Sequence, residues 1–378
     1  MRVGPAVIGI DASRAVSSAP TGTEAYSYHL IRALVPRLRD IYRLRLYYRE
    51  PPPPDAEPLK CAADGEARVI PFPRLWTHSR LSWEMLRLPP DLLFVPAHVL
   101  PLVRPARTLV TVHDLGYRSF PDAHPPAQRR YLELSTRWNV RVATHVLADS
   151  TATRDAIIEA FDIPHEKVSI VHPGYIPDLG PEPDQARIEQ VKRRYGIVGD
   201  YLLFIGRIQP RKNLPRLIAA FAQIAPRYPG LNLVLAGPMG WQTGIITEQV
   251  RESHVNSRVC FPGYIAAEDK GALISGACGF AYPSLYEGFG FPVLEAQACG
   301  TPLLASTTSS LPEVVGQGGL LVDPEDTDAI AAGLSRLLED SQLRQTLIQR
   351  GFDNLSRFSW DEAAERVATI IEAVLATP

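Results

Sequence analysis

Two carboxylates enclose a glycine-containing stretch in the second half of the chain. Glu287 and Glu295 are separated by seven residues, which include Gly288, Gly290 and a proline that favours the first turn of a helix. A strand predicted at 279–282 leads into this stretch, and the backbone N–H groups that begin a helix bind phosphate oxygens. Carboxylates accept hydrogen bonds from hydroxyls, so the stretch suits a ligand with both groups. Taken alone, the stretch is equally consistent with an ordinary turn whose glutamate is exposed to solvent.

A second loop brings positive charge. The predicted strand 201–205 runs into Gly206, Arg207, Lys212 and Asn213, with Asn213 as the expected N-cap of the next helix. In doubly wound sheets, the loops that follow the carboxyl ends of strands meet at one edge, where ligands bind. Arg207 and Lys212 are therefore expected to converge on a diphosphate.

The elements that must position these loops are short β-branched runs that alternate with longer helical patterns, which indicates parallel sheets covered by helices. Strands are predicted in the first half at 7–11, 43–48, 68–72, 92–95, 109–112, 145–148 and 168–171. The second half shows the same alternation, with strands predicted at 201–205, 232–236, 259–262, 279–282, 302–305 and 319–322. The predicted fold class is α/β, with two doubly wound, Rossmann-like units in series.

A stretch at 172–200 that is rich in proline and glycine is the expected hinge, with the boundary near residue 180. We predict an N-terminal Rossmann-like domain at 1–180 and a C-terminal one at 181–359. Ser359 is expected to cap a final helix at 360–378, which could pack back on the first domain.

The composition excludes some classes of function. The chain has 378 residues, more than one core usually organises, and its formal net charge of −2 gives no general attraction to nucleic acid. Four widely spaced cysteines predict neither a disulfide framework nor a zinc pair, so a reducing cytoplasm is the expected compartment. No apolar run reaches the roughly 18 residues of a membrane span.

An Asp-x-Asp sequence, Asp326 to Asp328, needs its own interpretation because such a motif can bind a metal. It precedes a helical pattern at 329–338, so Asp326 is expected to cap that helix. No histidine pair at helical spacing offers another metal site. We predict no metal ligand and no metal requirement.

The motifs of the second half together resemble a known family. The segment from Glu287 to Glu295 resembles the E-x7-E signature of retaining GT-B glycosyltransferases, the glycosyl transferases group 1 (family 4), which include bacterial mannosyltransferases and sucrose synthases. The segment 206–213 resembles the diphosphate-binding loop of that family. Further matches extend the resemblance over most of residues 200–325, at Gly237, 262–264, 298–302 and 311–316.

The first half resembles the family more loosely. Thr21 and Gly22 lie in a segment that resembles the glycine-containing loop that closes over the donor phosphates. His113, at the end of a predicted strand, resembles the histidine that reaches the donor sugar, whereas alone it would be read as a capped strand end. The resemblance implies the GT-B architecture, with two Rossmann-like domains facing each other across a cleft. The first domain would bind the acceptor and the second a nucleotide sugar.

The resemblance also implies roles for single residues. Arg207 and Lys212, with the amides of Phe289 and Gly290, would neutralise the departing nucleoside diphosphate, and Glu287 would bind hydroxyls of the donor sugar. Glu295 would bind the nucleotide ribose. The implied catalytic set is Arg207, Lys212, Glu287 and His113, without a covalent nucleophile. The implied donor-binding set is Thr21, Gly22, Gly206, Tyr264, Ile265, Gly288, Phe289, Gly290, Leu294 and Glu295, with Tyr264 and Ile265 beside the base.

Three segments, 8–11, 81–84 and 237–241, look closest to mannosyltransferases of bacterial surface polysaccharide synthesis. GDP-mannose is therefore the favoured donor. UDP-sugars are the alternatives, because motif spacing does not encode base or sugar. The expected acceptor is a glycan or a lipid-linked saccharide. Alternatives to glycosyl transfer are a GT-B epimerase, a phosphorylase and a non-catalytic subunit that binds sugar nucleotides.

Arginines cluster among apolar residues in the first half of the chain, namely Arg32, Arg37, Arg39, Arg43, Arg45 and Arg49. Such a cluster suits peripheral contact with the inner face of a membrane, and it equally suits a solvated surface.

Overall fold

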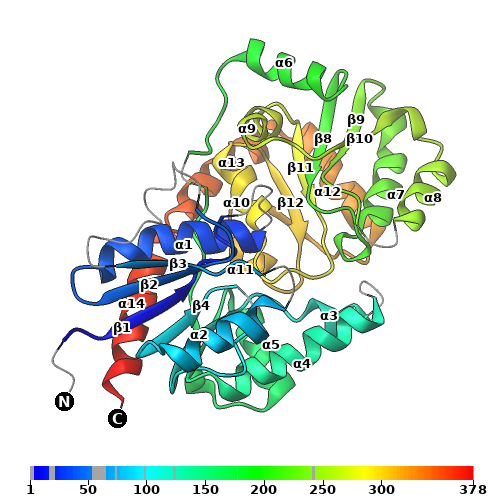
Figure 1. Cartoon of the computed structure of the whole chain (residues 1–378). Helices are drawn as coiled ribbons and strands as arrows, with labels where there is room; N and C mark the ends of the chain where they lie inside the picture. Colours follow the sequence, from blue (N-terminus) through cyan, green and yellow to red (C-terminus); the bar gives the residue numbers. More distant parts are fainter. Residues whose placement is uncertain are drawn as a thin grey trace. The chain divides into compact units, whose positions relative to one another are not determined.

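The computed structural model describes residues 4–16, 22–52, 65–72, 75–97, 99–121, 125–176, 178–240 and 243–377 (Figure 1). The chain forms two compact units. The first unit contains Met1–Leu115, Ala127–Gly174 and Phe358–Pro378, and the second contains Gly116–Pro126 and Tyr175–Arg357.

The described part of the first unit holds a seven-stranded parallel sheet in the order β3-β2-β1-β4-β5-β6-β7. Its strands are β1 (Val7–Asp11), β2 (Arg43–Tyr48), β3 (Glu66–Val69), β4 (Leu92–Val95), β5 (Arg107–Val112), β6 (His145–Ala148) and β7 (Val168–Ile170). The central strand β4 is buried along its whole length, as a strand covered on both faces must be. The edge strand β3 begins and ends earlier than the predicted 68–72, because Pro71 has no N–H to continue the ladder.

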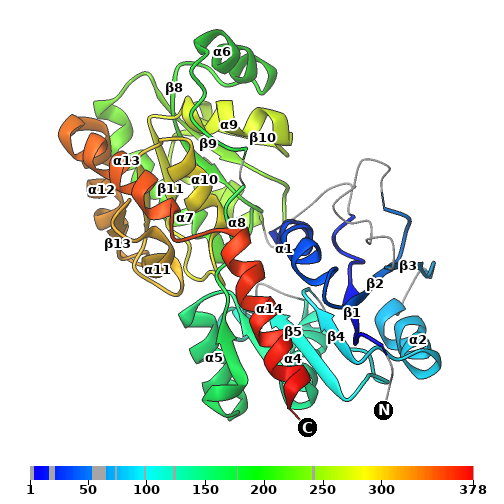
Figure 2. The same cartoon turned by 90° about the vertical axis from the view of Figure 1, so that its left-hand side faces the viewer.

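The helices of the first unit are α1 (Gly22–Leu38), α2 (Ser82–Arg87), α4 (Pro126–Val142), α5 (Thr151–Phe161) and α14 (Trp360–Ala376). A π-helical turn, η2 (Thr77–Leu81), leads into α2. The C-terminal helix α14 packs on α1 and β5, as its red ribbon shows in both views (Figure 2). Ser359 caps it by accepting hydrogen bonds from the N–H groups of Asp361 and Glu362, which confirms the predicted N-cap.

The described part of the second unit holds a six-stranded parallel sheet in the order β10-β9-β8-β11-β12-β13. Its strands are β8 (Asp200–Ile205), β9 (Leu231–Ala236), β10 (Val259–Gly263), β11 (Gly279–Tyr282), β12 (Leu303–Ser306) and β13 (Leu320–Val322). The strands β8 and β11 are neighbours although two strands lie between them in the chain. The sheet therefore extends from β8 through β9 to β10 on one side and from β11 through β12 to β13 on the other.

The helices of the second unit are α3 (Gly116–Ser119), α6 (Gln185–Arg194), α7 (Leu214–Ile224), α8 (Gly244–Glu252), α9 (Ala267–Ser275), α10 (Phe291–Ala298), α11 (Leu311–Val315), α12 (Thr327–Glu339) and α13 (Ser341–Leu355). Asp326 caps α12 by accepting from the N–H groups of Asp328 and Ala329, so its predicted capping role is confirmed. Fully buried Asp269 on α9 accepts from Arg187 and Arg194 of α6, at 2.6 Å each, and this ties α6 to α9.

Candidate active site

The two chemically suggestive loops of the second unit lie at the point where its sheet changes direction. One loop, 206–213, follows β8, and the other, 283–290, follows the neighbouring strand β11. Open parallel sheets bind their ligands beyond the carboxyl ends of the two strands at such a switch point. A backbone hydrogen bond of 2.9 Å from the Leu285 N–H to the Arg211 carbonyl joins the loops directly.

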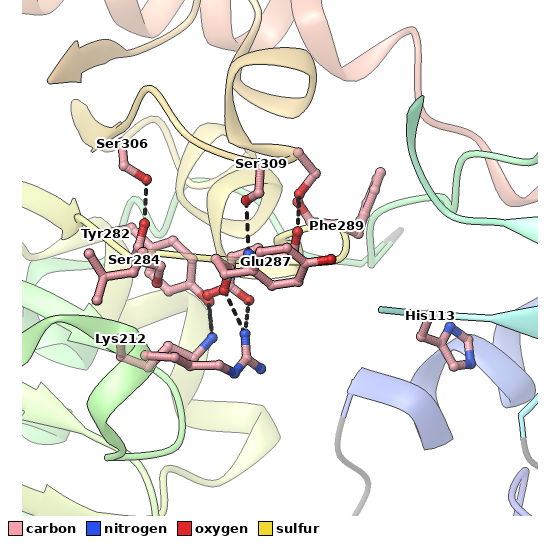
Figure 3. A network of polar contacts seen from close by, with 12 residues as sticks. His113, Lys212, Tyr282, Ser284, Glu287, Phe289, Ser306 and Ser309 are labelled. Carbon is pink, nitrogen blue, oxygen red and sulfur yellow. Dashed lines mark hydrogen bonds and ion pairs between the residues drawn. The ribbon is translucent and has the colours of Figure 1, made fainter. Parts of the chain in front are cut away.

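A buried carboxylate and two cations form the centre of this site (Figure 3). One oxygen of Glu287 lies 2.5 Å from the Nζ of Lys212, and the other lies 2.9 Å from Nη1 of Arg211. The ammonium of Lys212 also donates to the Tyr282 hydroxyl at 2.8 Å, and the guanidinium of Arg211 donates to the Tyr286 carbonyl at 2.7 Å. Both Glu287 and Lys212 are about 95% shielded from solvent, with 5% of each residue exposed.

The two cations decide the protonation state of Glu287. Burial raises the pKa of this carboxyl, but the positive charges of Lys212 and Arg211 outweigh burial and lower its pKa from an ordinary 4.5 to about 2. Glu287 is therefore ionised at neutral pH. The three side chains carry one net positive charge in a site that excludes water, which favours an anionic ligand.

Serine side chains hold the Glu287 loop in place. Ser309 accepts a hydrogen bond from the Glu287 N–H at 2.9 Å, while Ser310 donates to the carbonyls of Glu287 and Phe289. Ser306 donates to the Ser284 carbonyl at 2.5 Å. These bonds fix the backbone on both sides of the carboxylate, so its position does not depend on the ligand.

Asn213 occupies the predicted N-cap position of α7, but its side chain does not cap the helix. Its backbone adopts a left-handed conformation with φ of 59°, and its side chain makes no capping bond to α7. Its amide instead donates to the carbonyls of Pro283 and Pro324, at 3.1 and 2.6 Å. The residue is buried between loops, where those carbonyls would otherwise lack a donor.

The loop enters α10 through Gly290, whose φ is 112°. A side chain there would be strained, and its Cβ would lie 2.8 Å from Leu311. Gly288 and the buried ring of Phe289 precede it, and Leu294 lies fully buried in the first turns of α10. The helix α10 therefore begins directly after the loop that carries Glu287.

The second carboxylate of the motif, Glu295, is also paired. It accepts a hydrogen bond from Lys270 of α9 at 2.8 Å and is 6% exposed. Burial lowers the pKa of Lys270, but Glu295 more than offsets this, and the net result is a raised pKa. Tyr264 follows β10 and exposes 57% of its surface, whereas the adjacent Ile265 is buried.

Arg207 does not join the buried centre. It is exposed, and the described residues offer it no ion pair. The neighbouring Gly206 packs against Gly237, where a Cβ would lie only 2.0 Å from the Gly206 carbonyl oxygen. The structure therefore brings together Lys212 and Glu287 of the predicted catalytic set and leaves Arg207 at the surface.

His113 ends β5 in the first unit. Its Nδ1 lies 2.6 Å from a carboxylate oxygen of Asp149, which follows β6. Burial alone would lower the pKa of His113, but the charge of Asp149 outweighs it and the pKa is raised. The ring of Tyr26 packs edge-on against the imidazole at 4.7 Å. Nε2 has no hydrogen-bond partner within the described part of the chain.

The glycine-containing loop of the first unit is only partly described. Gly22 begins α1, whereas Thr21 lies outside the described residues.

The sequence interpretation missed four side chains that complete these sites, which are Arg211, Tyr282, Lys270 and Asp149. Arg211 adjoins Lys212, and Asp149 directly follows the predicted strand 145–148. The sequence therefore contained a signal for these two residues: Arg211 is a cation next to a predicted site residue, and Asp149 is an acid at the end of a predicted strand. Tyr282 and Lys270 are singled out only by the folded geometry.

Two further observations concern membrane spans and metal ligands. No helix in the described ranges is long and apolar enough to cross a membrane. Within the same ranges, no three His, Cys, Asp or Glu side chains gather into a group that could hold a metal ion.

Comparison with known proteins agrees with this geometry. The pattern of glycosyl transferases group 1 matches residues 189–353, and that of glycosyltransferase family 4 matches residues 20–179. O-antigen chain mannosyltransferase B of Escherichia coli is 32% identical over 361 residues, which are 90% of this chain and 93% of that protein. A D-inositol 3-phosphate glycosyltransferase of Salinispora arenicola is 32% identical over 297 residues, which are 73% of this chain and 64% of the relative.

Solved structures share the architecture at low sequence identity. The Anabaena protein Alr3699/HepE, in complex with UDP and glucose, superposes with a TM-score of 0.74 at 19% identity and covers 98% of this chain and 100% of its own. WaaG, a glycosyltransferase involved in lipopolysaccharide biosynthesis, gives a TM-score of 0.71 at 17% identity, with 97% and 99% covered. The chain therefore belongs to the family 4, group 1 glycosyltransferases, has the GT-B architecture of two Rossmann-like domains, and is a hexosyltransferase.

Proposed function

We propose that this hexosyltransferase moves mannose, with retention of the anomeric configuration, from GDP-mannose to a glycan or lipid-linked saccharide in surface polysaccharide synthesis. The relatives named O-antigen chain mannosyltransferase B and serotype-specific mannosyltransferase WbdA, both from Escherichia coli, support the choice of sugar. The observation that carries the proposal is the buried Lys212–Glu287–Arg211 cluster at the switch point of the second unit.

The cluster suits the departure of a nucleoside diphosphate. Negative charge develops on the leaving phosphate as the bond to the sugar breaks, and fixed cations that need no reorganisation stabilise that charge most effectively. Glu287 holds Lys212 and Arg211 in position through its two oxygens. We assign the backbone N–H groups of Phe289 and Gly290 to the phosphate oxygens. We assign leaving-group stabilisation to this cluster and to Arg207, which would close over the phosphates from the surface.

We assign the nucleoside to the far end of the same motif. Glu295 can accept hydrogen bonds from ribose hydroxyls while it is also paired with Lys270. Tyr264 exposes its ring beside this position and offers a surface on which a base can stack. The guanine base is proposed from the resemblance of segments 8–11, 81–84 and 237–241 to mannosyltransferases.

His113 is assigned to the donor sugar. Its Nδ1 is held by Asp149, and this fixes the orientation of the ring. The reaction is proposed to need no metal, because the cations of the second unit would supply the positive charge. A lipid-linked acceptor would bring the enzyme to a membrane surface.

A transfer assay with the purified full-length chain tests these assignments. The donors are GDP-mannose, UDP-glucose, UDP-galactose and UDP-N-acetylglucosamine, each with and without a mannose-containing acceptor. We expect acceptor-dependent release of GDP from GDP-mannose, with an α-linked product visible by NMR. Transfer only from a UDP-sugar would overturn the donor assignment, and a β-linked product would overturn retention.

The alternative activities give different products in the same assay. An epimerase would convert the donor sugar without an acceptor, and a phosphorylase would need inorganic phosphate. Binding of GDP without transfer or conversion of any donor would indicate a non-catalytic subunit. Lys212→Met should abolish transfer, whereas the exposed Arg227→Met should leave it unchanged.

A further inference from the structure

A fully buried carboxylate of the second unit, Asp269, takes no part in the chemistry assigned so far. It lies in the first turn of α9 and accepts hydrogen bonds from two arginines of α6 and from Tyr195, the residue that ends α6. Arg187 and Arg194 lie 2.6 Å from its two oxygens, and the Tyr195 hydroxyl lies 3.0 Å away. Burial alone would raise the pKa of Asp269, but its hydrogen bonds and the two positive charges outweigh burial and lower the pKa. Asp269 is therefore ionised at neutral pH, and its bonds to α6 are charge-assisted.

The Tyr195 hydroxyl also holds the turn that leads into α9. It accepts a hydrogen bond of 3.1 Å from the N–H of Ala266, the N-cap residue of α9, while it donates to Asp269. Asp269 is the third residue of the helix, where the acid of a capping box accepts directly from the N-cap N–H. Here the hydroxyl of Tyr195 lies between the two groups and bonds to both. Since the side chain of Ala266 cannot cap a helix, the start of α9 is fixed from α6.

The turn fixed in this way carries the proposed contacts to the base. Tyr264 and Ile265 lie between the last residue of β10, Gly263, and Ala266. Ile265 is buried, whereas Tyr264 is exposed. Because the hydrogen bond at Ala266 follows these two residues directly, it fixes the course of the backbone that presents the Tyr264 ring.

The next residue of α9 reaches the proposed ribose contact. Figure 1 and Figure 2 show α9 between α6 and α10. Lys270 follows Asp269, and neighbouring helix residues point about 100° apart, so the two side chains leave α9 on different sides. Asp269 meets α6, whereas Lys270 donates to Oε1 of Glu295 on α10 at 2.8 Å. The other oxygen of Glu295 has no hydrogen-bond partner among the described residues and can accept from a ligand hydroxyl.

A small movement of α9 would disturb both contacts. A hydrogen bond between nitrogen and oxygen requires about 2.7 to 3.2 Å, so a shift of roughly 1 Å would separate Lys270 from Glu295. The same shift would carry the turn at 264–266 with it. Asp269 resists such a movement, because a buried charge that loses one of its partners is strongly destabilised.

We propose that Tyr195 and Asp269 are positioning residues for the nucleoside of the donor. They hold α9, and α9 in turn holds the turn at 264–266 for the base and, through Lys270, Glu295 for the ribose. The proposal deepens the proposed function and rests on its assignment of base and ribose. Recognition of the nucleoside would thus depend on α6 and α9, while the diphosphate depends on the separate cluster around Glu287.

Isothermal titration calorimetry of the full-length chain isolates the nucleoside contribution without requiring catalysis. The ligands are GDP, dideoxy-GDP, which lacks both ribose hydroxyls, and inorganic pyrophosphate, which lacks the nucleoside. We expect the wild type to bind GDP about tenfold or more tightly than dideoxy-GDP, because hydrogen bonds to a charged group contribute that much. UDP and dideoxy-UDP are titrated in parallel, so that the comparison of ribose hydroxyls does not depend on the base.

Two variants test the positioning roles. Tyr195→Phe removes only the hydroxyl between Ala266 and Asp269, and it should weaken binding of GDP roughly three- to tenfold. Lys270→Met removes the partner of Glu295 and should reduce the preference for GDP over dideoxy-GDP to below about threefold. Neither change should alter the affinity for pyrophosphate.

Matched controls make the same chemical changes elsewhere in the second unit. Tyr228→Phe removes a hydroxyl that binds the exposed Glu339, and Lys192→Met breaks a pair with the exposed Glu189. Both controls should bind all ligands like the wild type.

Steady-state kinetics separate positioning from a general structural role. Tyr195→Phe should raise KM for the nucleotide sugar and leave kcat within about twofold of wild type, since the leaving-group cluster is unchanged. A fall in kcat together with the rise in KM, or an equal loss of pyrophosphate binding, would overturn the proposal.

The binding data also separate this inference from the proposed function. Wild-type affinity for GDP in Tyr195→Phe, or an undiminished preference for GDP over dideoxy-GDP in Lys270→Met, would overturn the inference and leave the ribose assignment intact. Equal binding of GDP and dideoxy-GDP by the wild type would refute the assignment of Glu295 to the ribose, and the inference with it.

Discussion

Replacing Glu287 by glutamine removes the one negative charge of the cationic cluster without changing the shape of the side chain. Lys212 would lose its carboxylate partner at 2.5 Å and Arg211 its partner at 2.9 Å. Both cations would then repel each other in a site from which water is largely excluded. We expect Glu287→Gln to destabilise the second unit and to reduce transfer at least a hundredfold, because removal of one preorganised group at a site of developing charge has an effect of that order.

The size of the stability loss follows from the pKa of Glu287. Its pKa is about 2 in the folded protein against an ordinary 4.5. At 1.36 kcal/mol for each pH unit, the difference corresponds to roughly 3 kcal/mol of folding free energy. A depressed carboxyl pKa stabilises the fold above pH 4.5, and this contribution is lost as the pH falls through about 2. For a unit of this size, such a loss lowers the melting temperature by about 10 °C.

Urea unfolding followed by circular dichroism, at pH 7 and at pH 3, measures both effects. The control is Glu339→Gln, which makes the same chemical change in the exposed Glu339–Arg227 pair and should cost under about 1 kcal/mol. The difference between Glu287→Gln and wild type should be smaller at pH 3 than at pH 7. The reasoning is refuted if Glu287→Gln is as stable as the control at pH 7, or if its deficit is the same at both pH values.

Three other predictions test separate parts of the structure. His113→Gln should abolish transfer. Because Asp149 raises the pKa of His113 in the folded protein, the variant should be least stable relative to wild type at acidic pH, and the difference should shrink as the pH rises through that pKa. Thermal melts from pH 5 to 9 measure this difference. Gly237→Ala should unfold or displace the Gly206 loop, because φ of Gly237 is +133° and a Cβ would lie 2.0 Å from the Gly206 carbonyl oxygen. Soluble yield and melting temperature measure the effect. The control is Gly230→Ala, because a Cβ at Gly230 would meet no atom within 4 Å. Treatment with EDTA followed by desalting should leave the rate of transfer unchanged, and a rate restored by Mg²⁺ or Mn²⁺ would contradict the metal-free proposal.

The strands could be predicted from the sequence, and every strand of both sheets overlaps a predicted one. The reason is physical. Parallel strands covered on both faces must be continuous apolar runs, and the turns between them need glycine and proline, so each strand leaves a local signal. Deviations occur at strand ends, as at β3, where Pro71 interrupts the ladder.

Side-chain partners could not be predicted in the same way. The sequence indicated that Lys212 and Glu287 lie at one sheet edge, but not that they bind each other, because that depends on two loop conformations fixed by Ser309 and Ser310. Asn213 shows the same limit. It occupies the N-cap position, yet its Oδ1 accepts from Arg216 instead of a helix N–H, and its amide nitrogen donates to the carbonyls of distant loops.

The difference between Lys212 and Arg207 suggests how the proposed chemistry is divided. Lys212 is buried and fixed by Glu287 before any ligand arrives, so its charge can act on a leaving phosphate without reorganisation. Arg207 is exposed, and ordering such a long side chain costs about 2 kcal/mol of conformational entropy. That cost must be offset by the bound diphosphate itself. A rigid buried cation therefore suits the charge that develops during the reaction, while a mobile surface cation suits capture and release of the nucleotide, and one loop after β8 carries both.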